Sequence, residues 1–75
     1  MSEGEVYVKR ELVLWVDTDL SVDEVKEEFP ECSVSYSDML GMVMIAFPST
    51  YTRDEAIRMV KKVLKPRKIY VYSYP

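Results

Sequence analysis

The pattern of hydrophobic and polar positions divides the chain into segments typical of strands and segments typical of helices. From Val6 to Val16 apolar residues recur at every second position, which is the period of a half-buried strand. Residues 32–36, 42–47 and 68–74 alternate in the same way. We therefore predict four strands over these ranges. Arg10 interrupts the apolar face of the first one, which predicts a bulge over 9–11 or a projecting ribbon formed with the end of the last strand.

Two helices are predicted between these strands by their end signals. Each begins at a Ser or Thr followed three residues later by Glu, a capping box, and each ends before a proline. The capping pairs are Ser21 with Glu24 and Thr52 with Glu55, and the prolines are Pro30 and Pro66. The turn over 37–41, with Gly41, joins the second and third strands.

The two halves of the chain match at a constant offset of 31 residues. This offset aligns Leu14 with Ile45 and Ser21 with Thr52, so strand faces and helix caps agree together. The βαββαβ order with this internal repeat is that of the split βαβ, or ferredoxin-like, α+β fold. Right-handed crossovers predict the strand order 4-1-3-2 in a four-stranded antiparallel sheet, with both helices on one face. We expect a single ferredoxin-like domain over residues 1–75.

The composition limits the expected partners, cellular location and source of this domain. The net charge of −3 lowers the expectation of nucleic-acid binding, because such proteins usually carry a basic excess. No apolar stretch approaches a membrane span, so we expect a cytoplasmic protein that does not bind membranes. Histidine, asparagine and glutamine are absent, which is typical of hyperthermophile proteins and predicts a thermophilic source. Deliberate design is the alternative, although five methionines and a free cysteine are unlike an idealised sequence.

The residues that could carry chemistry have simpler structural roles. Cys32 is the only cysteine, and without a histidine as base it is better interpreted as a small core residue than as a nucleophile. Asp17 and Asp19, with Asp23 and Glu24 behind them, resemble the strand-end carboxylates of some nucleases of similar topology. Capping and solvation of the helix start explain them better. We predict no enzymatic activity, catalytic residue, metal site, cofactor or small-molecule substrate.

Two further interpretations, acylphosphatase-like activity and ligand binding by a basic run, have no support in the sequence. Acylphosphatase-like activity depends on an asparagine, which this chain does not contain, and Asp17 and Asp19 would repel a phosphate. The basic run at the end of the second helix, with Lys61, Lys62 and Lys65, complements the helix dipole and needs no ligand.

The sheet face without helices is the most informative surface that the sequence predicts. Aromatic residues and Met are enriched in interface cores, so we expect this face to join copies of the chain, most simply as a homodimer. The predicted interface residues are Tyr7, Val13, Trp15, Met42, Met44, Tyr70 and Tyr72. A small binding, assembly or regulatory module is therefore the expected function.

Single-stranded nucleic acid is the alternative partner of this face. Sheets of this topology stack bases on aromatic side chains, as in the RNA recognition motif, while cations hold the phosphates. The residues available here are Lys9, Trp15, Arg67, Lys68, Tyr70 and Tyr72. The third strand carries Met42 and Met44 where that motif requires aromatics. We therefore place self-association first.

Overall fold

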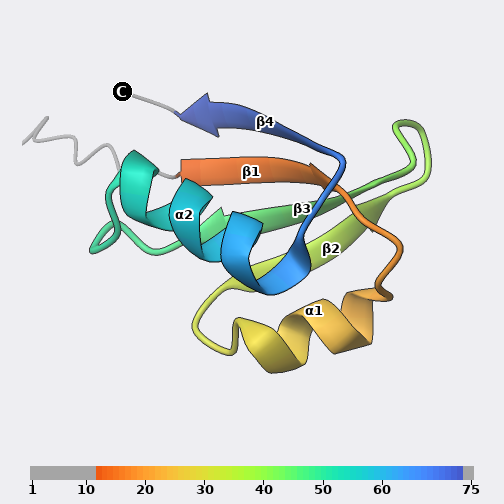
Figure 1. Cartoon of the computed structure of the whole chain (residues 1–75), viewed down its shortest axis with the longest axis horizontal. Helices are drawn as coiled ribbons and strands as arrows, with labels where there is room; N and C mark the ends of the chain where they lie inside the picture. Colours follow the sequence, from red (N-terminus) through yellow and green to blue (C-terminus); the bar gives the residue numbers. More distant parts are fainter. Residues whose placement is uncertain (1–11, 74–75) are drawn as a thin grey trace, which may run out of the picture.

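The computed structural model describes residues 12–73 and shows the predicted α+β arrangement (Figure 1). The element order is β1 (Leu12–Asp17), α1 (Val22–Glu28), β2 (Ser33–Ser37), β3 (Met42–Phe47), α2 (Arg53–Leu64) and β4 (Lys68–Ser73). The sheet order β2-β3-β1-β4 is the predicted 4-1-3-2 counted from the other edge, and all neighbours are antiparallel. The described residues thus adopt the ferredoxin-like fold.

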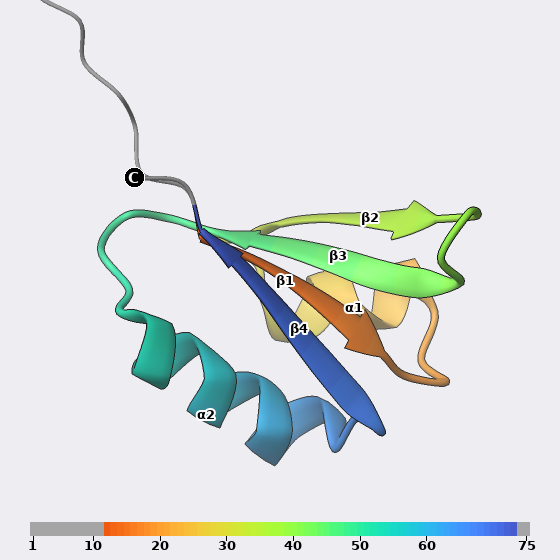
Figure 2. The ribbon, with the colours of Figure 1, turned by 90° about the horizontal axis from the view of Figure 1, so that it is seen from above.

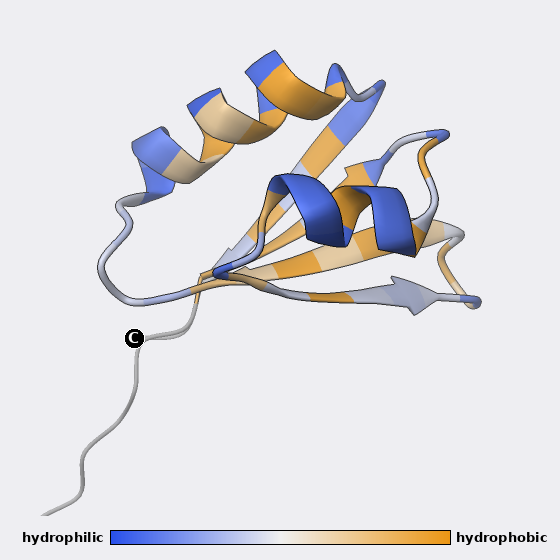
Figure 3. Ribbon diagram, turned by 90° about the horizontal axis from the view of Figure 1, so that it is seen from below, coloured by the Kyte–Doolittle hydropathy of each residue, from blue (hydrophilic) through white to orange (hydrophobic). Residues whose placement is uncertain are grey.

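Both helices lie on the same side of the sheet (Figure 2). The core between them and the sheet is built from alternate residues of the central strands, Leu14 and Val16 on β1 and Val43 and Ile45 on β3, all of them buried. Apolar positions of the helices face this core, and their polar positions face outward (Figure 3). The opposite side of the sheet, which we call the open face, is covered by neither of the two helices that residues 12–73 form.

Both capping boxes form as predicted. Ser21 Oγ accepts a hydrogen bond from the Glu24 N–H, and Glu24 Oε1 accepts one from the Ser21 N–H. The same reciprocal pair joins Thr52 and Glu55 at the start of α2. α1 is the shorter helix because Pro30 follows its C-cap at Phe29, whereas α2 continues until Lys65 adopts a left-handed conformation.

The strand boundaries differ from the predictions at three described positions, one of which is Ser37, predicted in the turn but paired with Met42 as the last residue of β2. β1 extends one residue further, to Asp17, because that residue still pairs with Lys68 of β4. β2 begins at Ser33, so Cys32 lies just before the strand, half-buried against the core. The predicted first half of strand one, the bulge over 9–11 and Tyr74 lie outside the described residues.

Candidate functional site

Strand register arranges the open face in rows that run across the sheet. The central row joins Ser35, Met44, Trp15 and Tyr70 from β2 to β4. A second row joins Ser33, Ala46, Val13 and Tyr72 in the same strand order. Serines therefore occupy the β2 side of the open face, and aromatic side chains occupy the β4 side.

The exposed aromatic part of this surface lies toward β4. Tyr70 and Tyr72 are 50% and 49% exposed, whereas Trp15 and Met44 are half-buried. Val13, predicted as an interface residue, is only 7% exposed, so it offers little area to a partner. Its buried state follows from its place in a central strand between the Ala46 and Tyr72 positions.

The structure brings together most of the predicted interface but not all of it. Trp15, Met42, Met44, Tyr70 and Tyr72 share the open face, with Met42 on the β3 position opposite Ser37. Tyr7, and Lys9 from the nucleic-acid set, lie outside the described residues. A surface centred on Trp15 and Tyr70 is therefore the candidate site that the described chain supports.

Arg67 has carboxylate partners that the sequence analysis did not predict. Its guanidinium donates hydrogen bonds to Asp17 Oδ1 at 2.9 Å and to both oxygens of Asp19 at 3.0 Å. The Arg67 N–H also donates to the Asp17 carbonyl at 2.9 Å. These bonds join the end of β1 and the loop after it to the turn before β4. Although 48 residues separate Arg67 from Asp19, the predicted strand order already placed the end of β1 beside the start of β4.

This pairing changes the electrostatics at one end of the open face. The hydrogen bonds and positive charge of Arg67 hold the pKa of Asp19 below its ordinary value. In return, two carboxylates surround a cation that the sequence analysis assigned to phosphate binding. Lys68 lies opposite Asp17 in the register and is exposed. The positive charge available to a nucleic acid is thereby reduced.

The remaining carboxylates near the start of α1 have a structural role. Hydrogen bonds from the backbone and side chain of Ser21 lower the pKa of Glu24, as expected for a capping carboxylate. Over residues 12–73, no group of three or more metal-ligating side chains comes together. Asp17, Asp19 and Glu24 are thus accounted for by an arginine and a helix cap.

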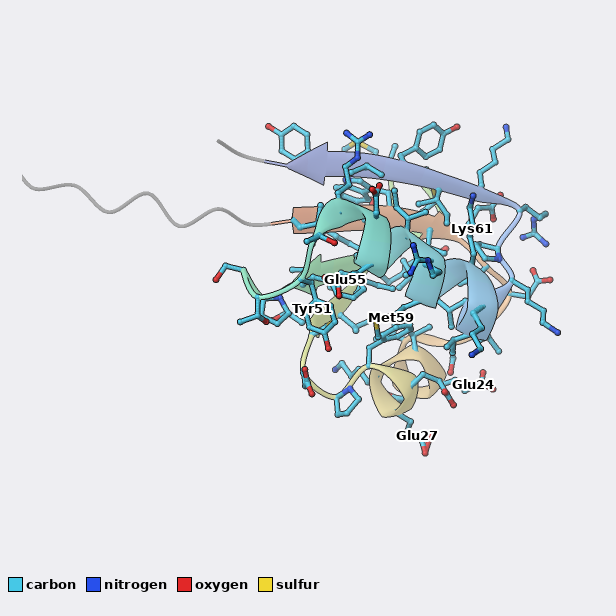
Figure 4. All side chains as sticks on the ribbon, turned by 60° about the vertical axis from the view of Figure 1, so that its left-hand side comes forward. Glu24, Glu27, Tyr51, Glu55, Met59 and Lys61 are labelled. Atoms are coloured by element: carbon cyan, nitrogen blue, oxygen red, sulfur yellow. The ribbon has the colours of Figure 1, made fainter. Side chains whose placement is uncertain are left out.

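Two shallow hollows lie on the helix side of the molecule. One, of about 120 Å³, is lined by residues that include Phe29, Cys32, Tyr51 and Met59. The other, of about 190 Å³, lies against Leu20 and three glutamates of α1. Figure 4 shows Tyr51 and Met59 near α1, with Glu24 and Glu27 on that helix. The Tyr51 hydroxyl donates to Glu31 Oε2 at 2.8 Å, and this bond raises the Tyr51 pKa.

Cys32, in the wall of the smaller hollow, has the environment of a structural cysteine. Loss of solvent, and secondarily the charge of Glu31, raises its pKa to about 11. The thiolate that a nucleophile needs is therefore scarce near neutral pH. The half-buried side chain packs against the core, in agreement with its interpretation as a small core residue.

Comparison with protein-family models, curated proteins and solved structures found no match. None of the helices over residues 12–73 has the length and apolar character needed to cross a membrane.

Proposed function

We propose that the chain is a small, non-enzymatic assembly module that associates with copies of itself through the open face. The observation that carries this proposal is the row in which Trp15 lies beside Tyr70, which is half exposed on the sheet face that neither α1 nor α2 covers. Trp and Tyr are the residue types most often responsible for binding energy in interfaces. A partner surface is the simplest use of this arrangement.

The size of the domain favours association. A chain of 75 residues hides only about 60% of the surface that its unfolded form exposes, so a second copy would extend a marginal core. Four strands about 4.8 Å apart and five residues about 3.3 Å apart make a face of roughly 300 Å². A stable interface buries about 800 Å² on each partner, so this face alone supports only weak association.

The chemistry of the described residues supports a non-enzymatic role. The raised pKa of Cys32 disfavours its use as a nucleophile. Asp17 and Asp19 are bound by Arg67, and Glu24 and Glu55 are bound in helix caps. We therefore assign no catalytic residue, metal or cofactor to the proposed function.

Sedimentation velocity over a concentration series tests the proposal. The mean mass of the wild-type chain should rise with concentration, and Trp15→Ala should weaken association by about thirtyfold or more, because an interface anchor contributes about 2 kcal/mol. Met39→Ala is the matched control, since Met39 is 93% exposed but lies in the turn after β2. A wild-type chain that remains monomeric at high micromolar concentration contradicts the proposal.

Binding of single-stranded nucleic acid is the second candidate, supported by half-exposed Tyr70 and Tyr72 on the same strand as exposed Lys68. Such binding would be weak because few cations are available on this face, and the contacts that these cations make with phosphates would weaken as salt rises. Fluorescence anisotropy with labelled single strands at low salt separates the two candidates. Saturable binding by the wild type that is lost in Tyr70→Ala favours nucleic acid, and no binding at tens of micromolar protein eliminates it.

A further inference from the structure

The two helices carry opposite charge. Residues 22–31, which include α1, contain five acidic residues and one lysine. Residues 56–66, which include most of α2, contain four basic residues and no acidic one. All of these charged side chains are exposed. Within residues 12–73 the ion pairs are those of Arg67 at the end of β1, so none joins α1 to α2.

These charges form stripes on the sides of the helices that face away from the sheet (Figure 3). Arg58, Lys62 and Lys65 follow one another along α2 at spacings of four and three residues, and we call them the basic stripe. Asp23 and Glu27 are four residues apart on α1, and we call them the acidic stripe. The buried residues of both helices lie on the opposite sides, against the core.

The electrostatics of α1 alone do not explain its acidic residues. Asp23 and Glu24 lie in the first turn, where negative charge complements the helix dipole. Glu27 and Glu28 lie in the last turn, where negative charge opposes the dipole. Within residues 12–73 neither of these two glutamates has an ion-pair partner. Their charges therefore point to a role outside their own helix.

The two hollows of the helix side form a furrow that has apolar residues in its walls. Phe29 and Met59 line the smaller hollow, Leu20 lines the larger one, and Glu28 lies in the walls of both. Met59 lies on the side of α2 that faces α1 (Figure 4). Val63, four residues further along α2, shares this side and is 38% exposed. Apolar residues at the centre with charged residues around them are typical of an interface.

We infer that the helix sides of two copies pack together about a twofold axis that runs along the furrow, with the acidic stripe of each copy against the basic stripe of the other. Rotation about this axis places α1 of one copy opposite α2 of the second, so both contacts form at once and the interface closes. A twofold axis across the furrow would instead place α1 against α1. Charge therefore selects the first orientation.

The direction of the helices agrees with this pairing. The start of α1 and the end of α2 lie at the same end of the domain (Figure 1). An axis along the furrow keeps these ends together, so the basic end of one α2 lies against the acidic start of the other α1. The facing helices are antiparallel, which also opposes their dipoles favourably.

The helix-side contact goes beyond the proposed function because it lies across the sheet from the open face. One copy can make both contacts, so the chain builds a linear stack in which open faces and helix sides alternate. The two contacts differ in chemistry. Exposed charge pairs are individually weak and are screened by salt, whereas burial of aromatic side chains is not.

Sedimentation velocity in a Trp15→Ala background measures the helix-side contact with the open-face anchor removed. This parent chain should associate at high micromolar concentration in about 0.05 M salt, where the Debye length exceeds 10 Å. Its association constant should fall by about tenfold or more when the salt is raised to about 0.5 M.

Charge reversal in the same background tests which stripes meet. Asp23→Lys with Glu27→Lys reverses the acidic stripe, and Arg58→Glu with Lys62→Glu and Lys65→Glu reverses the basic stripe. Each reversed chain alone presents like charges to its own copy and should associate about tenfold or more weakly than the parent chain. An equal mixture of the two should recover association, because every α1 again meets an α2 of opposite charge. Circular dichroism checks that both chains fold.

Asp38→Lys is the matched control for these reversals. It makes the same change of charge as Asp23→Lys, but in the turn after β2 and outside both stripes, and should associate like the parent chain. Reversed chains that associate like the parent, or a mixture that does not recover association, overturn the helix-side contact and show that the stripes are solvated helix surface.

The outcomes separate failure of this inference from failure of the proposed function. If the wild type associates and the Trp15→Ala chain stays monomeric at low salt, the helix-side contact is wrong and the open-face interface stands. If Trp15→Ala associates like the wild type and the reversed stripes abolish association, the helix-side contact is correct and the proposed function is wrong. A wild-type chain that does not associate overturns both.

Discussion

Leu14 and Trp15 are adjacent in the chain, and their side chains lie on opposite faces of β1. Leu14 is fully buried in the core beneath the helices. Trp15 is half-buried on the open face, opposite Met44 on one side and Tyr70 on the other. The predicted face assignment of strand one is therefore correct over its described part.

Substitution of these two neighbours should give opposite results. Leu14→Ala removes fully buried methyl groups and should destabilise the chain by about 2–5 kcal/mol, enough to unfold much of a domain this small. Trp15→Ala loses only cross-strand contacts on the open face, which contribute about 1 kcal/mol or less in a folded monomer. Urea unfolding of both variants at low micromolar concentration, where association is minimal, measures the difference. Equal losses would show that Trp15 is part of the core.

The hydrogen bonds between Arg67 and Asp19 predict that substitution of Arg67 changes the pKa of one carboxyl group selectively. In the wild type, hydrogen bonds and positive charge from Arg67 lower the Asp19 pKa, and Arg67→Ala should return it toward its ordinary value of 3.8. The lowered pKa of Glu24 comes mainly from Ser21 and should not change, so Glu24 is the internal control. Carbon-detected NMR titration of the carboxyl groups measures both. An unchanged Asp19 pKa would show that this ion pair does not form in solution.

Local patterns were sufficient to predict the layers of this fold. Alternation assigned Leu14 and Trp15 to opposite faces, and the pairs Ser21–Glu24 and Thr52–Glu55 located the helix starts. These predictions succeeded because strand period and cap chemistry depend on residues close in the chain. Tyr36 shows the limit of such patterns, since it alternates with the buried face yet is exposed at the sheet edge.

The candidate site was predicted less completely because its details depend on distant residues. The same alternation that identified the open face gave Val13 and Tyr70 equal weight, but Val13 lies on a central strand and is buried, whereas Tyr70 lies on the edge strand. The partners of Arg67 lie 48–50 residues away, at the end of β1 and in the loop that follows it, and no spacing rule links them to Arg67. Topology brings such residues near one another, and side-chain geometry then decides which of them pair.

Cys32 should react slowly with alkylating reagents. Its pKa of about 11, against an ordinary 9.0, makes the thiolate about a hundredfold scarcer at pH 8, and alkylation by iodoacetamide should slow in proportion. Ser33→Cys in a Cys32→Ser background provides an exposed thiol next to the same position for comparison. Glu31→Gln should accelerate the Cys32 reaction only modestly, since loss of solvent is the larger cause of the shift. If Cys32 reacts as fast as the exposed control, the case against a nucleophilic role loses its main support.

The cap of α2 should contribute stability that depends on pH. Thr52→Ala removes the hydroxyl that accepts the Glu55 N–H hydrogen bond and should cost about 1 kcal/mol near neutral pH. Hydrogen bonds from Thr52 lower the folded-state pKa of Glu55 below its ordinary 4.5, so the stability it contributes is complete above that value and is lost as the pH falls through the lowered pKa. The stability difference between wild type and Thr52→Ala should therefore narrow in acid, because the Thr52 hydroxyl also donates to the Glu55 carboxylate. Ser49→Ala, at an exposed position in the turn before α2, is the control and should show almost no loss at any pH. Thermal unfolding from about pH 7 to pH 3 measures all three chains, and a Thr52→Ala deficit that stays constant across this range would show that the charged carboxylate does not strengthen the cap.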